Sequence, residues 1–373
     1  MIELIEVTKI YKGQTVPAVD RLSLKIEKGE LCVFVGPSGC GKSTTLRMIN
    51  RMIEPTSGRI LIDNKDIREC DPDRLRMGIG YVIQQIGLLP HRTVAENIAI
   101  VPRLYGWPKE KIRQRVDELL ELIGLDPETT RDKYPAQLSG GQMQRVGVAR
   151  ALAADPPIML MDEPFGAVDP IARSHLQDEF LRIQKEMKKT ICFVTHDINE
   201  AIKMGDKIAI FNKGRLVQYG TPDEILTHPA NEFVRDFIGY DRVVKKLSLY
   251  QVEDLEEPVR CVLREEELPG IGEALRRSGS DIAFLVDSAG KPCGFLTAED
   301  LAQMGEGASP QSLKQKALCR RGAFAQREMV LRDALSLMLE HGTEHLGVLN
   351  GAELVGVVTL AAIRRHSCRK EGE

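Results

Sequence analysis

Short apolar runs alternate with longer segments of mixed polarity over the first two thirds of the chain. The runs 31–35, 158–161 and 191–195 are almost entirely apolar, as expected of strands that are buried on both faces of a sheet. A segment of helical composition, 44–53, follows the first run. This order of elements predicts an α/β domain.

The pattern changes after about residue 240. The stretch 241–258 ends in the acidic, proline-containing run EDLEEP, which predicts a linker. Beyond it, 272–297 and 332–359 resemble each other, and each half is predicted to contain a helix, a strand, a tight turn, a strand and a helix. We therefore expect one domain over 1–240, a linker over 241–258 and a smaller α+β domain over 259–373.

Composition and charge narrow the classes of function. Hydrophobic residues make up 43% of the 373 residues, which is typical of a globular protein. The formal net charge is −3 with both signs mixed along the chain, whereas nucleic-acid-binding domains usually carry a strongly basic surface. We therefore expect no nucleic-acid partner.

Membrane and redox signals are weak. The sequence has no run of about 18 apolar residues, and its acidic start lacks the basic and apolar regions of a secretion signal. These features predict a soluble cytosolic chain that reaches a membrane only through a partner. The eight cysteines show no CxxC pair and no zinc-site spacing to histidine, so we expect free thiols in a reducing compartment.

The stretch GPSGCGKSTT lies between the first apolar run and the predicted helix. It fits the phosphate-binding pattern G-x-x-x-x-G-K-[ST] in the strand-to-helix context that this pattern requires. Glycines let consecutive N–H groups point inward, while Lys42 would contact the β- and γ-phosphates of ATP and Ser43 would ligate Mg²⁺. The expected nucleotide contacts are Gly36, Ser38, Gly39, Cys40, Gly41, Lys42, Ser43 and Thr44. A glycine-rich turn without a ligand is the structural alternative.

Two acids follow the second apolar run. Asp162 would bind Mg²⁺, and Glu163 would accept a proton from the attacking water as general base. Paired acids after a strand are often only the solvated start of a loop. The motif LSGGQ, which begins at residue 138, precedes them by a short helical segment and argues against that alternative.

LSGGQ offers a second phosphate-binding surface made of a hydroxyl, backbone N–H groups and a helix N-terminus. Its candidate contacts are Ser139, Gly140, Gly141 and Gln142. Because one P-loop already covers the nucleotide in its own domain, this surface would serve a second subunit. A Gly-Gly turn that merely caps a helix is the alternative.

With these motifs in this order, the chain resembles the ABC-transporter ATPases over residues 1 to about 240. The resemblance implies an ABC-type P-loop ATPase domain with a helical subdomain, and a head-to-tail homodimer that holds ATP and Mg²⁺ between Walker A of one copy and the signature of the other. It further implies a switch histidine at His196, a glutamine at Gln84 that senses Mg²⁺ and water, an adenine-stacking aromatic at Tyr11 and a loop between the two sites at Asp169. Gln85 leaves the register of the glutamine open. Taken alone, a histidine after a strand is more often structural, and an isolated tyrosine near a strand end is commonly half-buried packing.

The stretches 48–67 and 79–99 are similar to the ATPase subunits of glycine betaine/carnitine/choline importers. This resemblance implies an integral membrane permease, an extracytoplasmic solute-binding protein and a peripheral location on the cytoplasmic face of the cell membrane. An importer for another small solute, such as an amino acid, a polyamine or a sugar, is the alternative. ATPases that act on DNA or ribosomes usually carry two cassettes or a long coiled coil, and this sequence shows neither. A nucleotide sensor without hydrolysis is disfavoured by Glu163 together with His196.

The repeat after residue 258 resembles a pair of CBS modules. Their T-x-x-D pattern, in which the aspartate takes a ribose hydroxyl, is present in the first half as Thr297 and Asp300 but is absent after Thr359. One adenine-nucleotide site at most is expected, and a spacing or dimerising domain without a ligand is the alternative. Basic residues could instead contact anionic lipid. They are Lys314, Lys316, Arg320, Arg321, Arg327, Arg364, Arg365, Arg369 and Lys370.

Overall fold

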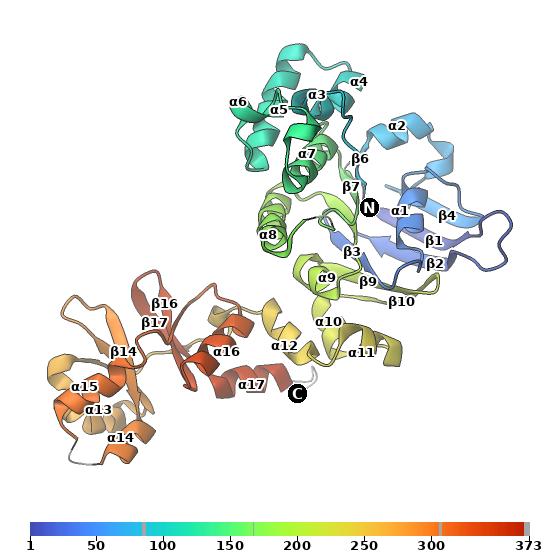
Figure 1. Ribbon diagram of the computed structural model, residues 1–373. Helices are drawn as coiled ribbons and strands as arrows, with labels where there is room; N and C mark the ends of the chain where they lie inside the picture. The colour runs from blue at the N-terminus through green and yellow to red at the C-terminus, as the bar shows by residue number, and fades with distance from the viewer. Residues whose placement is uncertain (84–86, 167, 306–307, 369–373) are drawn as a thin grey trace. The chain divides into compact units, whose positions relative to one another are not determined.

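The computed structural model describes residues 1–83, 87–166, 168–305 and 308–368. The chain divides into two compact units, Met1–Gly239 and Tyr240–Glu373, which are described separately (Figure 1). Within the described residues, no helix combines the length and the apolar composition needed to cross a bilayer. The cysteines whose side chains are described are free thiols, as expected.

The first unit contains two sheets. An antiparallel sheet has the order β2-β1-β4-β5, with β1 Ile2–Lys9, β2 Val19–Ile26, β4 Ser57–Ile62 and β5 Lys65–Asp66. The second sheet has the order β10-β9-β3-β8-β7-β6, with β3 Leu31–Val35, β6 Ile79–Val82, β7 Ile158–Asp162, β8 Thr190–Val194, β9 Lys207–Asn212 and β10 Arg215–Gly220. The main apolar core lies between the two sheets and includes the tilted ring pair Phe34–Phe211.

The strands β3, β8 and β7 are parallel neighbours and are buried along their whole length. Their continuous apolar runs follow from this burial on both faces. The three strands end at one edge of the sheet, so the segments that follow them are brought together there. The helix after β3, α1, spans Lys42–Ile49 and so begins two residues earlier and ends four residues earlier than the segment expected from sequence.

Helices α3 to α7 form a group between β6 and β7 (Figure 1). They are α3 Val94–Ile98, α4 Ile100–Leu104, α5 Lys109–Leu122, α6 Pro127–Thr130 and α7 Gly140–Leu152. The remaining helices of the unit are α2 Pro72–Met77, α8 Pro170–Met187, α9 Ile198–Met204, α10 Pro222–Thr227 and α11 Glu232–Ile238, with short 3₁₀ turns at Ile67–Glu69 and Pro135–Gln137. The inserted group is the helical subdomain that the resemblance implied.

The predicted linker over 241–258 is wrong. This segment forms α12 Arg242–Lys246, 3₁₀ turns at Leu247–Leu249 and Val252–Asp254, and β11 Glu257–Pro258. Leu247 and Val252 are buried in the core of the second unit. Three of the acids that indicated a linker, Glu253, Asp254 and Glu257, are exposed, whereas Glu256 is half-buried and pairs with Arg327.

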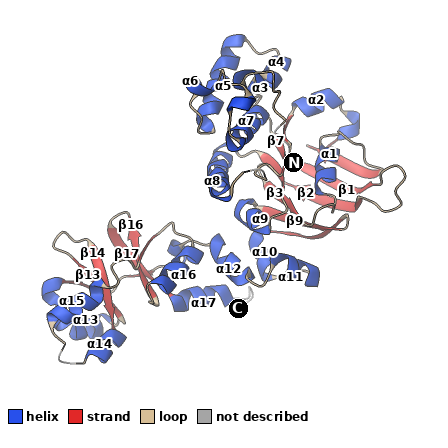
Figure 2. Ribbon diagram, in the orientation of Figure 1, coloured by secondary structure: helices blue, strands red, loops and turns tan. Residues whose placement is uncertain are grey.

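The second unit contains the two predicted halves. The first has η5 Glu265–Gly270, α13 Ile271–Ser278 and α14 Ala298–Met304 around the sheet β12-β13-β14, with β12 Val262–Arg264, β13 Ile282–Val286 and β14 Pro292–Thr297. The second has α16 Leu331–Glu340 and α17 Leu360–Cys368 beside the sheet β11-β17-β16-β15, with β15 Phe324–Gln326, β16 His345–Asn350 and β17 Glu353–Thr359. Helix α15, Pro310–Leu318, connects them and packs on β14, on the same side as α13 and α14 (Figure 2).

Candidate nucleotide-binding and catalytic site

The loop after β3 owes its shape to glycines that no other residue could replace without strain. Gly36 and Gly41 have φ angles of 152° and 103°, in the region that L side chains rarely adopt. A Cβ on Gly36 would overlap the carbonyl oxygen of Phe211, and one on Gly41 would overlap that of Ala18. The backbone is therefore packed tightly on its outer side. Gly41 is also the N-cap of α1 and offers no side chain to the first N–H groups of the helix, which leaves them available to an anion.

Lys42 is folded back over this loop. Its Nζ donates hydrogen bonds to the carbonyl oxygens of Gly36 and Pro37, at 2.7 and 3.0 Å, and lies 3.6 Å from Cys40 Sγ. These acceptors are uncharged, so the ammonium keeps a full positive charge for a phosphate. Ser38 and Gly39 are exposed at the tip of the loop, where a nucleotide would approach.

Ser43 and Asp162 meet across the ends of two strands. Ser43 Oγ donates a 2.9 Å hydrogen bond to Asp162 Oδ1, and the aspartate is only 3% exposed. Burial raises the pKa of Asp162, while the bond from Ser43 lowers it. The two oxygens suit Mg²⁺, which prefers oxygen ligands and takes the rest from water and phosphate. The described residues contain no group of three or more His, Cys, Asp and Glu that could hold a metal ion.

Glu163 follows directly and turns away from the strand. Its φ angle is 48°, an uncommon value for a residue other than glycine, and its N–H donates to the carbonyl oxygen of Val194 at 3.0 Å. Its Oε2 lies 3.4 Å from Nδ1 of His196, whose side chain is 60% exposed. The structure therefore brings together the predicted base and the predicted switch histidine.

Tyr11 and Thr44 mark the outer side of the phosphate loop. The Tyr11 hydroxyl lies 3.4 Å from Thr44 Oγ1, and Lys9 Nζ lies 5.5 Å from the centre of the tyrosine ring. The ring is about one third exposed. It is thus next to the P-loop and has surface left for a flat apolar group.

Known proteins match this arrangement. Residues 19–166 match a family model described as ABC transporter, and residues 319–368 match one described as CBS domain. The chain is 46% identical over 368 residues to the glycine betaine/carnitine/choline transport ATP-binding protein OpuCA of Bacillus subtilis, covering 97% of this chain and 95% of that protein. The chain belongs to the ABC transporter ATP-binding proteins.

Two further comparisons concern this ABC ATPase. It is 50% identical over 302 residues to the osmoprotectant import ATP-binding protein OsmV of Salmonella typhimurium, covering 79% of each chain. Among solved structures, the dimeric post-hydrolysis state of the ATP-binding cassette MJ0796 bound to ADP and Pi matches with a TM-score of 0.55 and 37% identity. That match covers 60% of this chain and 99% of the other, so it concerns the ATPase unit. ATP hydrolysis coupled to transport is the activity of this family.

The signature of this ABC ATPase caps α7. Ser139 Oγ accepts from the N–H of Gln142 and the Gln142 side chain accepts from the N–H of Ser139, so the two residues form a capping box. Ser139 and Gly140 are exposed, and a Cβ on Gly140 or Gly141 would meet open space. This surface therefore faces solvent.

The remaining predicted positions are Gln84, Asp169 and the end of the basic tail. Gln84 lies outside the described residues, as do Arg369 and Lys370 of the basic tail. Asp169 is exposed just before α8, and its carbonyl oxygen accepts from the N–H of Arg173 at 2.9 Å.

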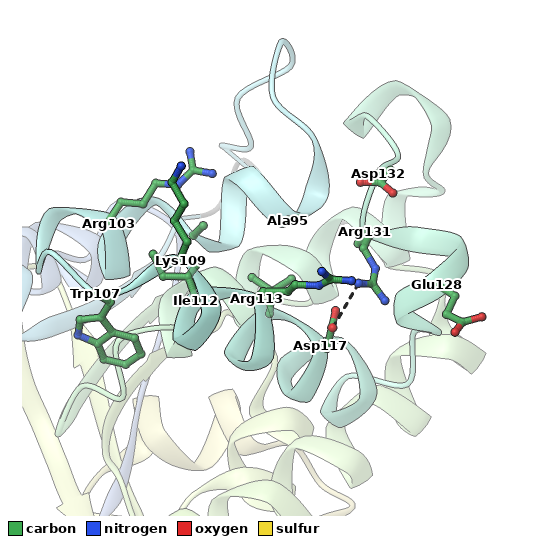
Figure 3. Close-up of a pocket in the computed structure, with 12 residues that line it drawn as sticks. Ala95, Arg103, Trp107, Lys109, Ile112, Arg113, Asp117, Glu128, Arg131 and Asp132 are labelled. Carbon is green, nitrogen blue, oxygen red and sulfur yellow. Dashed lines mark ion pairs between the residues drawn. The ribbon is translucent and has the colours of Figure 1, made fainter.

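Sequence reasoning missed a groove in the helical subdomain (Figure 3). Its volume is about 820 Å³. In Figure 3, Arg113 and Arg131 lie beside Asp117 and the Trp107 ring lies at the other end of the groove; Arg131 Nη1 is 3.3 Å from Asp117 Oδ2. Exposed Leu104 and Tyr105 precede the tryptophan. The run LYGW was the available signal, because it places three large apolar or aromatic residues within four positions.

The predicted ribose-binding residues are already engaged. Thr297 and Asp300 form a capping box at α14, and Thr297 donates to Asp300 Oδ2 from both its N–H and its hydroxyl, at 2.9 and 2.8 Å. Arg320 donates to both carboxylate oxygens, to Oδ1 at 3.0 Å, and Lys316 Nζ lies 3.6 Å from Oδ1. Burial alone would raise the pKa of Asp300, but the bonds from Arg320 and Thr297 outweigh it and the pKa is lowered.

Proposed function

We propose that Lys42, Ser43, Asp162, Glu163 and His196 hydrolyse ATP in a homodimer, with the signature residues of a second copy completing each site. The observation that carries this proposal is the meeting of two pairs at one sheet edge, Ser43 with Asp162 and Glu163 with His196. Parallel strands β3, β7 and β8 deliver all of these side chains.

Each residue has a separate task. Lys42 would leave its carbonyl acceptors and bind the β- and γ-phosphates, and the exposed N–H groups of the loop would hold the remaining oxygens. Ser43 and Asp162 would hold Mg²⁺, with Gln84 as a further ligand; the ion, when bound, neutralises phosphate charge. Glu163 would take the proton of the attacking water at its carboxylate, while His196 would orient Glu163 and contact the γ-phosphate. Tyr11 would stack on adenine, and Asp169 would lie between the two sites.

We further propose that the transported solute is a quaternary amine of the glycine betaine, carnitine and choline class. The names of the relatives support this class, since they include transport proteins for glycine betaine, carnitine and choline. The system would comprise this subunit on the cytoplasmic face of the membrane, an integral permease and an extracytoplasmic solute-binding protein. The alternative is an importer of another small solute, such as an amino acid, a polyamine or a sugar.

We propose that the groove in Figure 3 receives a cytoplasmic segment of the permease. Its lining combines the Trp107 ring with four basic residues and three acids, which suits an amphipathic segment that carries apolar side chains and charges of both signs. An Arg113→Glu substitution should then reduce co-purification of the permease from detergent extracts while leaving nucleotide affinity unchanged.

The C-terminal unit would regulate transport through an adenine nucleotide or anionic lipid. A ribose at Asp300 would have to compete with Arg320 for the carboxylate. Anionic lipid would have to compete with existing ion pairs, because five of the basic residues already pair with acidic residues of the same unit. They are Lys314, Lys316, Arg320, Arg327 and Arg365.

The solute class is tested by uptake into vesicles that contain the complete transporter. Glycine betaine, carnitine and choline should be accumulated in an ATP-dependent manner and should compete with one another. Competition by a polyamine, an amino acid or a sugar in place of these amines would refute the class without affecting the proposed hydrolysis.

A further inference from the structure

A buried polar cluster lies behind the catalytic edge. Glu200, on α9, is only 8% exposed although it is an acid, and Gln177, on α8, is 6% exposed. Gln177 Nε2 donates to Glu200 Oε1 at 2.9 Å. Burial raises the pKa of Glu200, and hydrogen bonds with Thr195 and Gln177 offset part of this effect. A buried acid is costly unless its hydrogen bonds are satisfied, so its presence requires an explanation.

On one side the cluster holds the turn that carries His196. Thr195 is 2% exposed, and its N–H donates to the carbonyl oxygen of Phe34, in the strand that leads into the P-loop, at 3.1 Å. Its Oγ1 accepts from the N–H of Asp197 at 3.0 Å. That acceptor role leaves the Thr195 hydroxyl proton for Glu200. Thr195 therefore fixes the backbone on both sides of His196: its own N–H is bonded to Phe34, and its hydroxyl oxygen is bonded to the N–H of Asp197.

On the other side the cluster reaches the loop before α8. Arg173 lies one helical turn before Gln177, so both face the same neighbour. Arg173 Nη2 donates to the carbonyl oxygen of Val168 at 3.0 Å, and its charge lowers the pKa of Glu200. The same polar cluster thus contacts the segment that contains Asp169.

We infer that Glu200 is a positioning residue, which fixes the His196 turn to α8 through Thr195 and Gln177 so that His196 stays aligned with Glu163. The inference rests on the proposed roles of Glu163 and His196. It also explains why the cluster is polar: an apolar contact would hold the helices together but would not fix the orientation of the turn.

A second contact between the same helices provides a matched control. Lys203 on α9 pairs with Asp178 on α8 at 2.7 Å and donates to Ser174. This contact is partly exposed and does not reach the His196 turn. A residue that serves only to attach α9 to α8 should therefore behave like Lys203.

The test compares four substitutions in the full chain assembled with its permease. Glu200→Leu and Gln177→Leu should each lower kcat by about tenfold or more, since small misplacements of catalytic groups have effects of this size, and KM for ATP should change less than about twofold. Glu200→Gln should restore kcat to within about threefold of the wild type, because an amide can still accept from Gln177 and bond with Thr195. Lys203→Met should match the wild type.

Several results would overturn the inference. One such result is a Gln177→Leu variant whose kcat equals that of Lys203→Met. This result counts even if Glu200→Leu fails to fold, because Gln177→Leu removes the same Gln177–Glu200 hydrogen bond. A Glu200→Leu or Gln177→Leu variant in which KM for ATP rises while kcat is unchanged would also overturn it. The same holds if the kcat of Glu200→Gln is as low as that of Glu200→Leu. Glu163→Gln, measured in parallel, separates the two proposals: retained hydrolysis there would refute the proposed site, and its loss beside a normal Gln177→Leu would refute the positioning role alone.

Discussion

Among single residues, Lys42 and Tyr11 offer the nucleotide two different kinds of contact, a charge and an aromatic ring face. Lys42 is buried, charged and held by neutral acceptors within the phosphate loop. Tyr11 is partly exposed at the edge of the loop and offers only a ring face. The two residues should therefore contribute very differently to binding.

Lys42→Ala should weaken ATP binding by roughly tenfold to a hundredfold, as expected for losing about 1.5–3 kcal/mol of charged hydrogen bonding. Tyr11→Ala should cost only about 1 kcal/mol, or about fivefold in Kd. Equilibrium binding of ATP to the two purified variants checks this order. Equal affinities of the wild type and Lys42→Ala would contradict the assignment of the loop.

The residues of the ATP site could be predicted because phosphate and Mg²⁺ chemistry requires fixed residue types at short spacings. Gly36 to Thr44 form one continuous stretch, and Asp162 and Glu163 are adjacent. The pairs Gln177–Glu200 and Asp300–Arg320 could not be predicted, because their partners are about twenty residues apart and on different elements. No sequence pattern sets which buried acid meets which donor.

At the scale of elements, strand signals were more reliable than signals for connections. Continuous apolar runs identified β3 and β7 because parallel strands are buried on both faces. The acidic stretch before residue 258 was misinterpreted as a linker because its two core residues, Leu247 and Val252, are too widely spaced to give a period. Helix α14 carries Asp300, which is paired with Arg320 near the start of the second half. This ion pair should therefore contribute to the stability of the unit.

Asp300→Ala should lower the free energy of unfolding by about 1.5–3 kcal/mol, because the partly buried guanidinium of Arg320 loses its charged hydrogen bonds to the carboxylate. Glu273→Ala, which removes an exposed ion pair with Arg277, should change it by less than about 1 kcal/mol. Urea denaturation of both full-length variants measures the difference. An Asp300→Ala variant as stable as the wild type would argue that the pair can be released for a ribose.

At the scale of the whole molecule, the described catalytic side chains all lie in Met1–Gly239, whereas the CBS-like repeat lies in the other unit. This separation predicts that hydrolysis and its regulation can be uncoupled. The catalytic motifs were enough to identify the ATPase unit from the sequence. The regulatory signal could not be predicted, because it depends on surface charges that pair within the second unit, such as Lys314 with Glu265 and Arg327 with Glu256.

Removal of residues 240–373 should preserve ATP hydrolysis by the transporter but abolish its dependence on salt and on anionic lipid. The reason is electrostatic, since the Debye length falls to about 8 Å near 0.15 M salt and an inhibiting contact with lipid would weaken. Hydrolysis is measured in vesicles with and without anionic lipid over a range of salt. A truncated transporter that responds to salt like the full-length one would contradict regulation by this unit.

In the proposed mechanism two copies of the chain enclose ATP, and Glu163 activates the attacking water. The most direct measurement combines the mass of full-length Glu163→Gln in solution, with and without Mg²⁺ and ATP, with its rate of hydrolysis. We predict an ATP-dependent dimer whose turnover is lower than that of the wild type by about 10²–10⁴-fold, because phosphate contacts remain while the proton acceptor is gone. A variant that hydrolyses ATP at the wild-type rate, or that stays monomeric with ATP bound, would contradict the account.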